Sequence, residues 1–274
     1  AGVGADLPDG LLPVQLTTDY KGKPVAGPDW WALDDFLAFR AGKAFKDPDW
    51  ISRGWTEPPP DIRAHVAIDR KRQASRTGQL FQTAGLDCVA DNLRLLGPDP
   101  DMAADIELIA TFSEPLAASV VHLGGERRLA QLQPLQETAL PPPPEGWLEA
   151  INKAGGLSLT LLTPGAFSAG YRPGWLDASL SGVVPDTDDL QLTLVAVAIG
   201  RWQPHSGWDL AARAPRQTRK LAAAGTTYWF RLMQPLTPGQ LDHLWLRSIA
   251  DREQDRRDSY ALALPAPWTP PTNH

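Results

Sequence analysis

Apolar positions divide the chain mainly into strand-like stretches, and helical spacing appears only in short segments. Residues 62–69 alternate between apolar and polar positions, which predicts a half-exposed strand, and an apolar strand resumes at Leu80. Residues 190–199 (LQLTLVAVAI) are apolar at almost every position of their second half, which predicts a strand in the centre of a sheet. Further strands are predicted at residues 106–112, 157–162 and 226–233.

Three short helices are predicted from helical spacing and from residues that favour helix ends. They cover residues 29–40 and 145–154 and a segment that begins at residue 237. An N-cap side chain accepts a hydrogen bond from the first turn, and glycine favours the position just past the last turn. The end-marking residues are Asp29, Gly42, Gly155, Thr237 and Pro238. Many strands with few helices indicate an α+β protein.

A basic, turn-rich segment joins the two strands of a predicted hairpin. Residues 70–78 read RKRQASRTG, and such a segment between an alternating strand and an apolar strand is typical of a β-hairpin. Charge runs commonly face water, so one interpretation is a solvated hairpin tip. The other interpretation is a loop that contacts nucleic-acid phosphates. The candidates for that role are Arg63, Arg70, Lys71, Arg72 and Arg76.

Two glycines precede a pair of arginines in residues 121–130, which read VHLGGERRLA. Glycine allows backbone N–H groups to approach a ligand closely, and guanidinium groups bind phosphate through two parallel hydrogen bonds. The pattern predicts an anion-binding turn, although a tight turn with solvated arginines would have the same sequence. The candidate residues are Gly124, Gly125, Arg127 and Arg128.

Cations and an aromatic residue are interleaved in residues 205–220, which contain four cations and one acid. A surface for single-stranded RNA needs this combination, because an aromatic ring stacks on a base while cations follow the phosphates. A mobile basic loop would have the same composition, and that alternative stays open. The candidate residues are Trp208, Arg213, Arg216, Arg219 and Lys220.

Charges almost cancel between Arg247 and Asp258, where four arginines face three aspartates and one glutamate. This balance favours an ion-pair network or a protein interface over a bare RNA-binding surface. Arg256 and Arg257 are the candidates for RNA contact in this segment. Residues 265–274 are rich in proline, and we expect them to fray.

Composition narrows the classes of protein that fit. Because the net charge is −6, any affinity for nucleic acid has to come from local basic loops. The single cysteine, Cys88, excludes an internal disulfide and a cysteine-based zinc site, and it fits a reducing, cytoplasmic setting. No apolar run approaches the ~20 residues of a membrane helix, so we expect no membrane contact.

Motifs for catalysis or cofactor binding are missing from the sequence. The five histidines are scattered, and there is no Walker loop, GxGxxG or GxSxG. We therefore expect no enzymatic activity, no cofactor and no metal. His65 is the one candidate general acid or base, but its apolar neighbours favour a structural role. The 11 tryptophans would also fit a carbohydrate-binding module, which predicts exposed, coplanar rings and leaves the arginine-rich loops unexplained.

Three segments together resemble one protein family. The hairpin fits the pattern R-x-H-V-x-I-D…A-x-x-G-x-L-F of the RAMP proteins of type III CRISPR effectors. The segments LGGERRLA and SGWDL…P-R-x-x-R-K…A-G-T-x-Y-W-F resemble the third subunit of the type III-B (Cmr) complex. The C-terminal segment of this family usually reads QDRRDGFG, whereas Ser259 and Ala261 stand here in place of the glycines. This departure argues against close approach of that loop's backbone to RNA.

The resemblance implies a ferredoxin-like (βαββαβ) RAMP fold in residues 61–274, with residues 1–60 a connector from an N-terminal lobe that the chain mostly lacks. It implies a non-catalytic subunit that binds the 5′ tag of CRISPR RNA (crRNA), caps the backbone filament and docks the large polymerase/cyclase-type subunit. The partners would be crRNA, that large subunit and the backbone RAMP subunit, with target RNA contacted only indirectly. Two alternatives are the equivalent subunit of another type III subtype and a crRNA-processing endoribonuclease that uses His65.

Overall fold

The chain divides into two compact units, which we call the core unit (residues 1–21 and 140–274) and the hairpin unit (residues 22–139). The computed structural model describes residues 8–14, 27–43, 54–55, 60–86, 107–110, 112, 114–124, 128–135, 140–209 and 211–271. The boundary that we expected at residue 60 lies inside the hairpin unit. Strands dominate and helices are few, so the chain is an α+β protein as predicted. Among the described residues, no helix is long and apolar enough to span a membrane.

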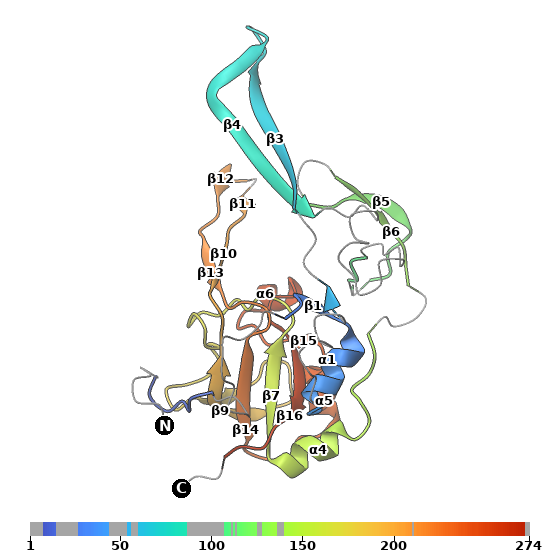
Figure 1. The fold of residues 1–274 in the computed structure, drawn as a ribbon, viewed down its shortest axis with the longest axis vertical. Coiled ribbons are helices and arrows are strands. Elements are labelled where there is room, and N and C mark those ends of the chain that lie inside the picture. The colour runs from blue at the N-terminus through green and yellow to red at the C-terminus, as the bar shows by residue number, and fades with distance from the viewer. Residues whose placement is uncertain are drawn as a thin grey trace. The chain divides into compact units, whose positions relative to one another are not determined.

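A six-stranded antiparallel sheet organises the core unit, in the order β15-β16-β7-β14-β9-β8 (Figure 1). Its strands are β7 (Gly156–Leu161), β8 (Ser181–Val183), β9 (Gln191–Ala198), β14 (Thr227–Leu232), β15 (Arg247–Ser248) and β16 (Leu262–Pro267). Strands β7, β9 and β14 confirm three predictions. However, β9 is the second strand from one edge, with only the short strand β8 outside it, and the central pair is β7 and β14.

The order of four of these strands follows a simple pattern. β7 and β9 lie parallel to each other on either side of β14, and β14 and β16 lie parallel on either side of β7. Helices α5 (Pro238–Leu244) and α6 (Glu253–Arg257) lie in the connection from β14 to β16. The connection from β7 to β9, residues 162–190, is fully described and contains no helix. The first helix of the expected βαββαβ pattern is therefore absent.

Local hydrogen bonds explain why the β7–β9 connection is irregular. It is rich in glycine, serine and proline, which disfavour a helix interior. The carboxylate of Asp251 instead accepts hydrogen bonds from the backbone N–H groups of Ser168 and Gly174, each at 2.6 Å, and from the Ser168 hydroxyl at 2.7 Å. Gly174 is required here, because a Cβ atom would lie 2.1 Å from the Ser168 hydroxyl oxygen.

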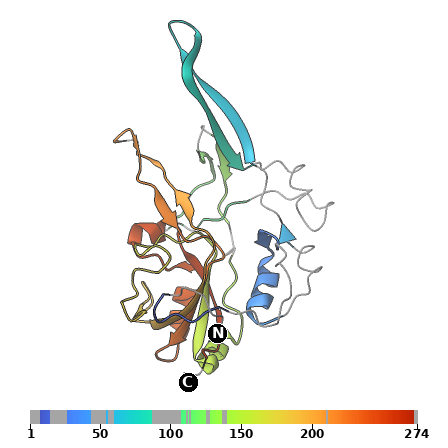
Figure 2. The ribbon, with the colours of Figure 1, turned by 60° about the vertical axis from the view of Figure 1, so that its left-hand side comes forward.

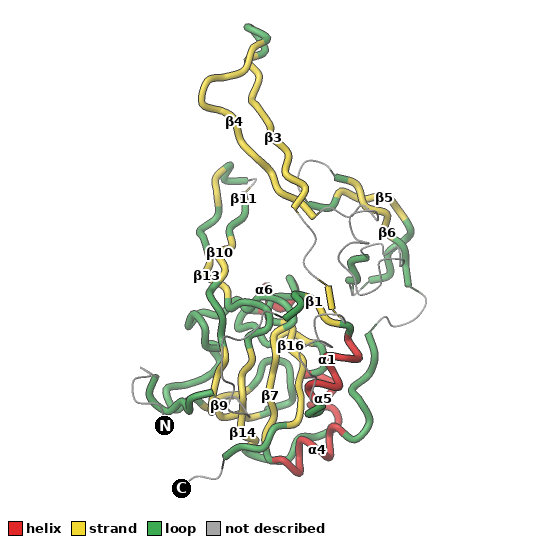
Figure 3. Tube along the Cα trace, in the orientation of Figure 1, coloured by secondary structure: helices red, strands yellow, loops and turns green. Residues whose placement is uncertain are grey.

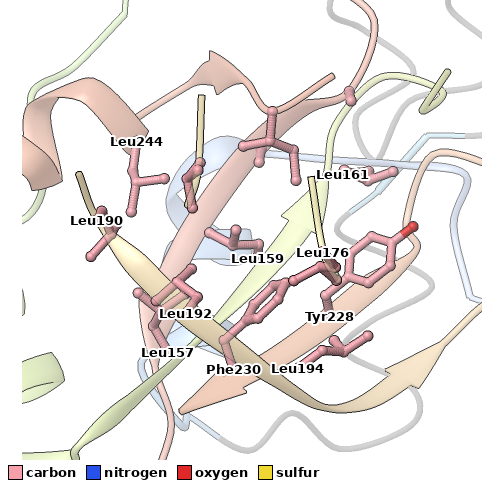
Figure 4. Packing of buried hydrophobic residues seen from close by; sticks show 14 of the residues in the cluster. Leu157, Leu159, Leu161, Leu176, Leu190, Leu192, Leu194, Tyr228, Phe230 and Leu244 are labelled. Atoms are coloured by element: carbon pink, nitrogen blue, oxygen red, sulfur yellow. The ribbon is translucent and has the colours of Figure 1, made fainter. Parts of the chain in front are cut away.

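Apolar side chains of the sheet and of α4 (Trp147–Ala154) form the hydrophobic core (Figure 4). Every residue of β7 is buried, and Ile151 of α4, Tyr228 and Phe230 are almost fully excluded from solvent. Burial of a large apolar side chain stabilises the fold by about 1.5–3 kcal/mol. Helix α4 ends at Gly155, which has a φ of +70°, and this confirms the predicted helix end.

Capping confirms the predicted start of α5. The backbone N–H of Gln240 donates to the Thr237 hydroxyl, and the backbone N–H of Thr237 donates to the Gln240 side chain. This reciprocal pair is a capping box, and Pro238 occupies the first helical position.

The prediction that residues 265–274 fray is wrong for residues 265–271. Pro265 and Ala266 belong to β16 and are buried, and the backbone N–H of Trp268 donates to Gly156.

Short elements and a long ribbon make up the hairpin unit (Figure 3). They are β1 (Trp30–Trp31), α1 (Leu33–Arg40), β2 (Gly54–Trp55), β3 (Pro60–Asp69), β4 (Ala74–Leu86), β5 (Ser119–His122) and β6 (Leu129–Leu132). The predicted cap Asp29 is wrong: α1 starts later, after Ala32, because the two tryptophans before it pair with β2. Gly42, with a φ of +94°, ends the helix as predicted. The strand predicted at residues 106–112 is absent from residues 107–110 and 112.

The ribbon of β3 and β4 is the predicted hairpin, but its turn occupies residues 70–73 rather than 70–78. The carboxylate of Asp69 shortens the turn by accepting hydrogen bonds from the backbone N–H groups of Lys71 and Arg72. The residues before Leu80 form a bulge in β4, which contains Gly78 at a φ of +74°.

Apolar side chains remain exposed throughout the described part of the hairpin unit. Ile62, Val66, Ile68 and Leu80 are between 44% and 73% exposed. Within this part, no hydrophobic side chain is buried, so a two-stranded ribbon of this length lacks the packed face that normally stabilises one.

Candidate nucleic-acid interface

A two-stranded arm, residues 202–221, extends from the core unit (Figures 1 and 2). It consists of β10 (Gln203–His205), β11 (Trp208–Asp209), β12 (Ala214–Pro215) and β13 (Arg219–Leu221). β10 pairs with β13 and β11 with β12, so much of the predicted basic loop has strand structure. The Asp209 carboxylate closes the tip by accepting hydrogen bonds from the backbone N–H groups of Ala211 and Ala212. These bonds, led by that from Ala212, hold the pKa of Asp209 below its usual value.

One side of the arm's base is anchored to the segment around α6. His205 pairs with Arg219 across β10 and β13, and both side chains reach this segment. Arg219 donates two hydrogen bonds of 2.7 Å to the carboxylate of Asp255, which is only 4% exposed. The Nε2 atom of His205 lies 2.8 Å from the Tyr260 hydroxyl. These contacts fix the base of the arm to the core unit.

The position of Arg219 changes the role that we assign to it. Its hydrogen bonds to Asp255 raise its pKa, and its guanidinium lies 5.5 Å from the centroid of the Tyr260 ring. The positive charge is therefore compensated within the protein. We predicted a phosphate contact, but the geometry makes Arg219 an anchor of the arm.

Apart from these anchoring contacts, the arm presents cations and aromatic rings to solvent. Lys220 pairs with Pro204 across the strands, and its ammonium lies 5.0 Å from the centroid of the Trp202 ring. Trp202 is 48% exposed and Trp208 is 57% exposed. Arg213, Arg216 and Lys220 form no ion pair with another described residue. Trp202 was missed by the sequence analysis because it precedes the basic segment, although the frequency of tryptophan was a signal.

The C-terminal segment forms the ion-pair network that its charge balance predicted. The Nε atom of Arg256 lies 2.7 Å from Asp186, and its Nη1 atom donates to the carbonyl oxygens of Ala250 and Asp251. Arg257 pairs with Glu253 at 2.6 Å. Both arginines were predicted RNA contacts, but their charges are paired within the protein.

Left-handed backbone occurs at both positions where the family usually has glycine. Ser259 has a φ of +61° and Ala261 a φ of +55°, which is the region that glycine adopts most easily. The backbone at both positions therefore has the conformation that glycine favours, although neither residue is glycine.

Four cations surround the tip of the hairpin. Arg70, Lys71, Arg72 and Arg76 are exposed and form no ion pair with another described residue. They are thus available to an anionic partner, and their contact with RNA stays a prediction.

The two arginines at the base of the hairpin are paired instead. Asp61 lies 2.7 Å from Arg63 and 3.2 Å from Arg128, and the hydrogen bond from Arg63 is the main cause of its lowered pKa. A residue with a side chain at position 85 would collide with Arg128, because a Cβ atom built on Gly85 would lie 2.0 Å from the guanidinium. Gly124 has a φ of +76°, and Gly125 and Arg127 lie outside the described residues.

His65 has a structural environment. Its Nε2 atom lies 2.9 Å from the Thr83 hydroxyl, and its ring stacks on Phe81 at 5.2 Å between centroids. In the described part of the chain, no three His, Cys, Asp or Glu residues lie close enough together to hold a metal ion.

Comparison with known proteins decides the family. The model of the family described as "CRISPR-associated protein (Cas_Cmr3)" matches residues 4–268, nearly the whole chain. The chain belongs to the Cas_Cmr3 family. This confirms the resemblance that rested on the hairpin, the glycine-rich segment and the arm, and it identifies the chain as a Cmr subunit.

The solved structures that are similar to this Cmr3-family chain include two of the type III-B Cmr-beta complex, while no curated protein matched it. A chain of the type III-B Cmr-beta complex bound to cognate target RNA and AMPPnP (state 1) has a TM-score of 0.39 and 12% identity, and the match covers 75% of our chain and 61% of that chain. A chain of the same complex bound to cognate target RNA has a TM-score of 0.35 and 12% identity, with 72% and 55% covered. The chain thus spans less than two thirds of these relatives.

Proposed function

We propose that this Cmr3-family chain is a non-catalytic subunit of a type III-B CRISPR effector complex, in which it binds the 5′ tag of crRNA. The solvent-exposed surface of the arm carries the proposal. It combines three cations that form no ion pair with another described residue, Arg213, Arg216 and Lys220, with two exposed indole rings, and the anchored base of the arm keeps them in a defined place. Stacking on bases and contact with phosphates are the two needs of single-stranded RNA.

The cationic tip of the hairpin is a second proposed RNA contact. Within the described residues, no carboxylate forms an ion pair with its four cations, and the nearby Asp69 side chain is engaged with the backbone of the turn. The chain's net charge is −6, so attraction to RNA has to be local, and the arm and this tip are the regions that supply it.

We further propose a ferredoxin-like origin for the core unit and a docking role for the chain within the complex. The order β16-β7-β14-β9 and the parallel pairs β7/β9 and β14/β16 fit a βαββαβ sheet whose first helix has been replaced by residues 162–190. In the complex the chain would cap the backbone filament and contact the large polymerase/cyclase-type subunit. The exposed apolar side chains of the hairpin unit support such protein contacts.

The environment of His65 favours binding over RNA processing. A general acid or base has to reach the proton it transfers, whereas this imidazole is partly buried, stacked and bonded to Thr83. We therefore propose no crRNA-processing activity for this chain.

A gel-shift titration tests the proposed function. RNA with a repeat-derived 5′ tag is titrated with the chain and its large partner subunit at two salt concentrations, and wild type is compared with an Arg213→Gln/Arg216→Gln/Lys220→Gln variant. Arg219 is left intact, because its removal would leave Asp255 buried and unpaired. A Lys153→Gln/Arg231→Gln/Arg247→Gln variant removes three cations elsewhere on the core unit as the charge control.

The proposal predicts weaker binding of tagged RNA by the arm variant and a smaller dependence of affinity on salt, by about 0.7 per lost phosphate contact. The charge control should bind almost as wild type does. Equal binding of tagged and untagged RNA, or an arm variant that matches wild type, would refute the assignment.

A further inference from the structure

The outer edge of β3, which faces away from β4, is regular along its length. β3 pairs with β4 on its other side, and among the described residues no further strand pairs with it (Figure 1). Edge strands are usually protected from further pairing by proline, bulges or charged side chains. Residues 61–69 contain no proline or glycine, and Arg63, the one cation between Ile62 and Ile68, is paired with Asp61. The edge therefore presents a regular row of backbone N–H and C=O groups.

The outer edge of β4 is interrupted by comparison. Residues 76–79 of β4 lie opposite Ala67 alone, and this bulge includes Gly78 with its φ of +74°. A bulge bends a strand and breaks the row of backbone groups that a partner strand would need. Of the two edges of the ribbon, that of β3 is therefore the one suited to further pairing.

One face of the ribbon carries an apolar stripe, which consists of Ile62, Val66, Ile68 and Leu80. Alternate residues of a strand point to the same face, and Val66 lies opposite Leu80. All four side chains are exposed. A two-stranded ribbon is marginally stable in water, whereas three strands with a hydrophobic face can be stable. The β3 edge and the apolar stripe thus fit the same occupant, an extended segment whose alternate residues are apolar.

Charge distinguishes between the possible sources of such a segment. Residues 60–86 carry five cations and two carboxylates. Two ribbons paired edge to edge would bring these positive charges together, whereas an acidic segment of another protein would be attracted. An RNA strand lacks the alternating N–H and C=O groups that pair with a strand edge. The observations therefore favour an acidic protein segment over a second copy of the chain and over RNA.

We propose that a partner protein of the effector complex adds an extended segment, with alternating apolar and acidic residues, to the outer edge of β3 as a third strand. Main-chain hydrogen bonds to residues 61–69 supply affinity, and apolar side chains of the segment extend the apolar stripe. The inference rests on the proposed place of the chain in the complex and names the chemistry of one partner contact. The cationic tip of the hairpin keeps its proposed contact with RNA.

Amide hydrogen exchange, measured residue by residue in the full chain alone and in the assembled complex, tests the proposal. In the free chain, alternate amides of residues 61–69 should exchange fast, because they face away from β4. In the complex these amides should slow by about tenfold or more, as expected for one or two net hydrogen bonds. The outward-facing amides of residues 80–86 should exchange at the same rate in both samples.

Two matched variants locate the contact on β3. Ile62→Lys/Ile68→Lys places two charges on the apolar stripe beside the β3 edge, and Gln82→Lys/Ala84→Lys places two charges on the same face of β4. Gln82 and Ala84 are exposed and lie opposite Ala64 and Ile62. The added segment would lie about 5 Å from β3 but about 10 Å from β4. The protection of the β3 amides should therefore be lost in the first variant and kept in the second.

The outcomes separate the inference from the proposed function. If the complex assembles with the chain and binds tagged RNA while the β3 amides exchange as fast as in the free chain, the inference is refuted and the proposed function stands. If the chain does not enter the complex, both fail. Equal loss of protection in the two variants would indicate docking through the face of the ribbon and would refute strand addition.

Two controls test the other occupants. Protection that increases with the concentration of the free chain would assign the β3 edge to a second copy. Protection in the complex that ribonuclease removes would assign the edge to RNA. Either result would overturn the proposal, whereas protection that depends on the complex and survives ribonuclease would support it.

Discussion

Ser259 and Ala261 hold left-handed backbone without being glycines, and their replacement by glycine has opposite expected effects on stability. Left-handed φ costs an L-residue about 1–2 kcal/mol, which glycine relieves. Glycine also makes the unfolded chain more flexible, at a cost of about 0.4–1 kcal/mol. The backbone terms alone therefore favour glycine at both positions by roughly 0.5 kcal/mol.

Burial decides the difference between the two positions. The methyl group of Ala261 is fully buried, and its loss costs about 0.8 kcal/mol, whereas Ser259 is exposed. We expect Ser259→Gly to raise the free energy of unfolding by roughly 0.5 kcal/mol and Ala261→Gly to lower it slightly. For a unit of this size, 1 kcal/mol corresponds to a Tm change of about 2–4 °C.

Urea denaturation and calorimetry of the three proteins would measure these changes. Ala211→Gly is the matched control, since Ala211 is exposed and is not among the residues with positive φ. It should destabilise the chain by about 0.4–1 kcal/mol. If Ser259→Gly destabilises the chain as much as this control does, the loop carries no left-handed strain and the reasoning is refuted.

Two further predictions concern charged groups. Asp255→Asn should destabilise the core unit by about 1–3 kcal/mol and speed amide hydrogen exchange in residues 203–221, because Arg219 loses its charged partner. Unchanged exchange in these residues would contradict the role of Arg219 as an anchor of the arm. The pKa of Asp177 is lowered, chiefly by the hydrogen bond from the Ser179 hydroxyl, so its stabilising effect is present above pH ~4 and is lost as the pH falls through the folded-state pKa. Urea midpoints should therefore decline in acid, and less steeply for Asp177→Asn; identical profiles would show that this group does not contribute.

Local features of the fold were predictable because the residues that determine them are close together in the sequence. Thr237 and Gln240 form a capping box within one turn, and Gly155 ends α4 with the left-handed φ that glycine favours. The hairpin of β3 and β4 was predictable from its alternation, whereas the length of its turn depends on the Asp69 side chain.

Pairings between distant residues were not predictable. Arg219 belongs to a cationic run in the sequence, but its partner Asp255 comes 36 residues later. The partner of Asp251 is also distant in the sequence. Its carboxylate accepts hydrogen bonds from Ser168 and so organises an irregular connection where a helix was expected. Two-residue strands such as β11 depend on pairing across the arm rather than on periodicity, so they have no signature of their own.

Crosslinking within the assembled effector complex tests the central claim most directly. RNA with photoreactive nucleotides in the 5′ tag would be irradiated in the complex, and the crosslinked peptides of this chain identified by mass spectrometry. The account predicts adducts within residues 202–221, above all on Trp202, Trp208 or Lys220. Adducts confined to other subunits, in a complex that holds the tagged RNA, would contradict it.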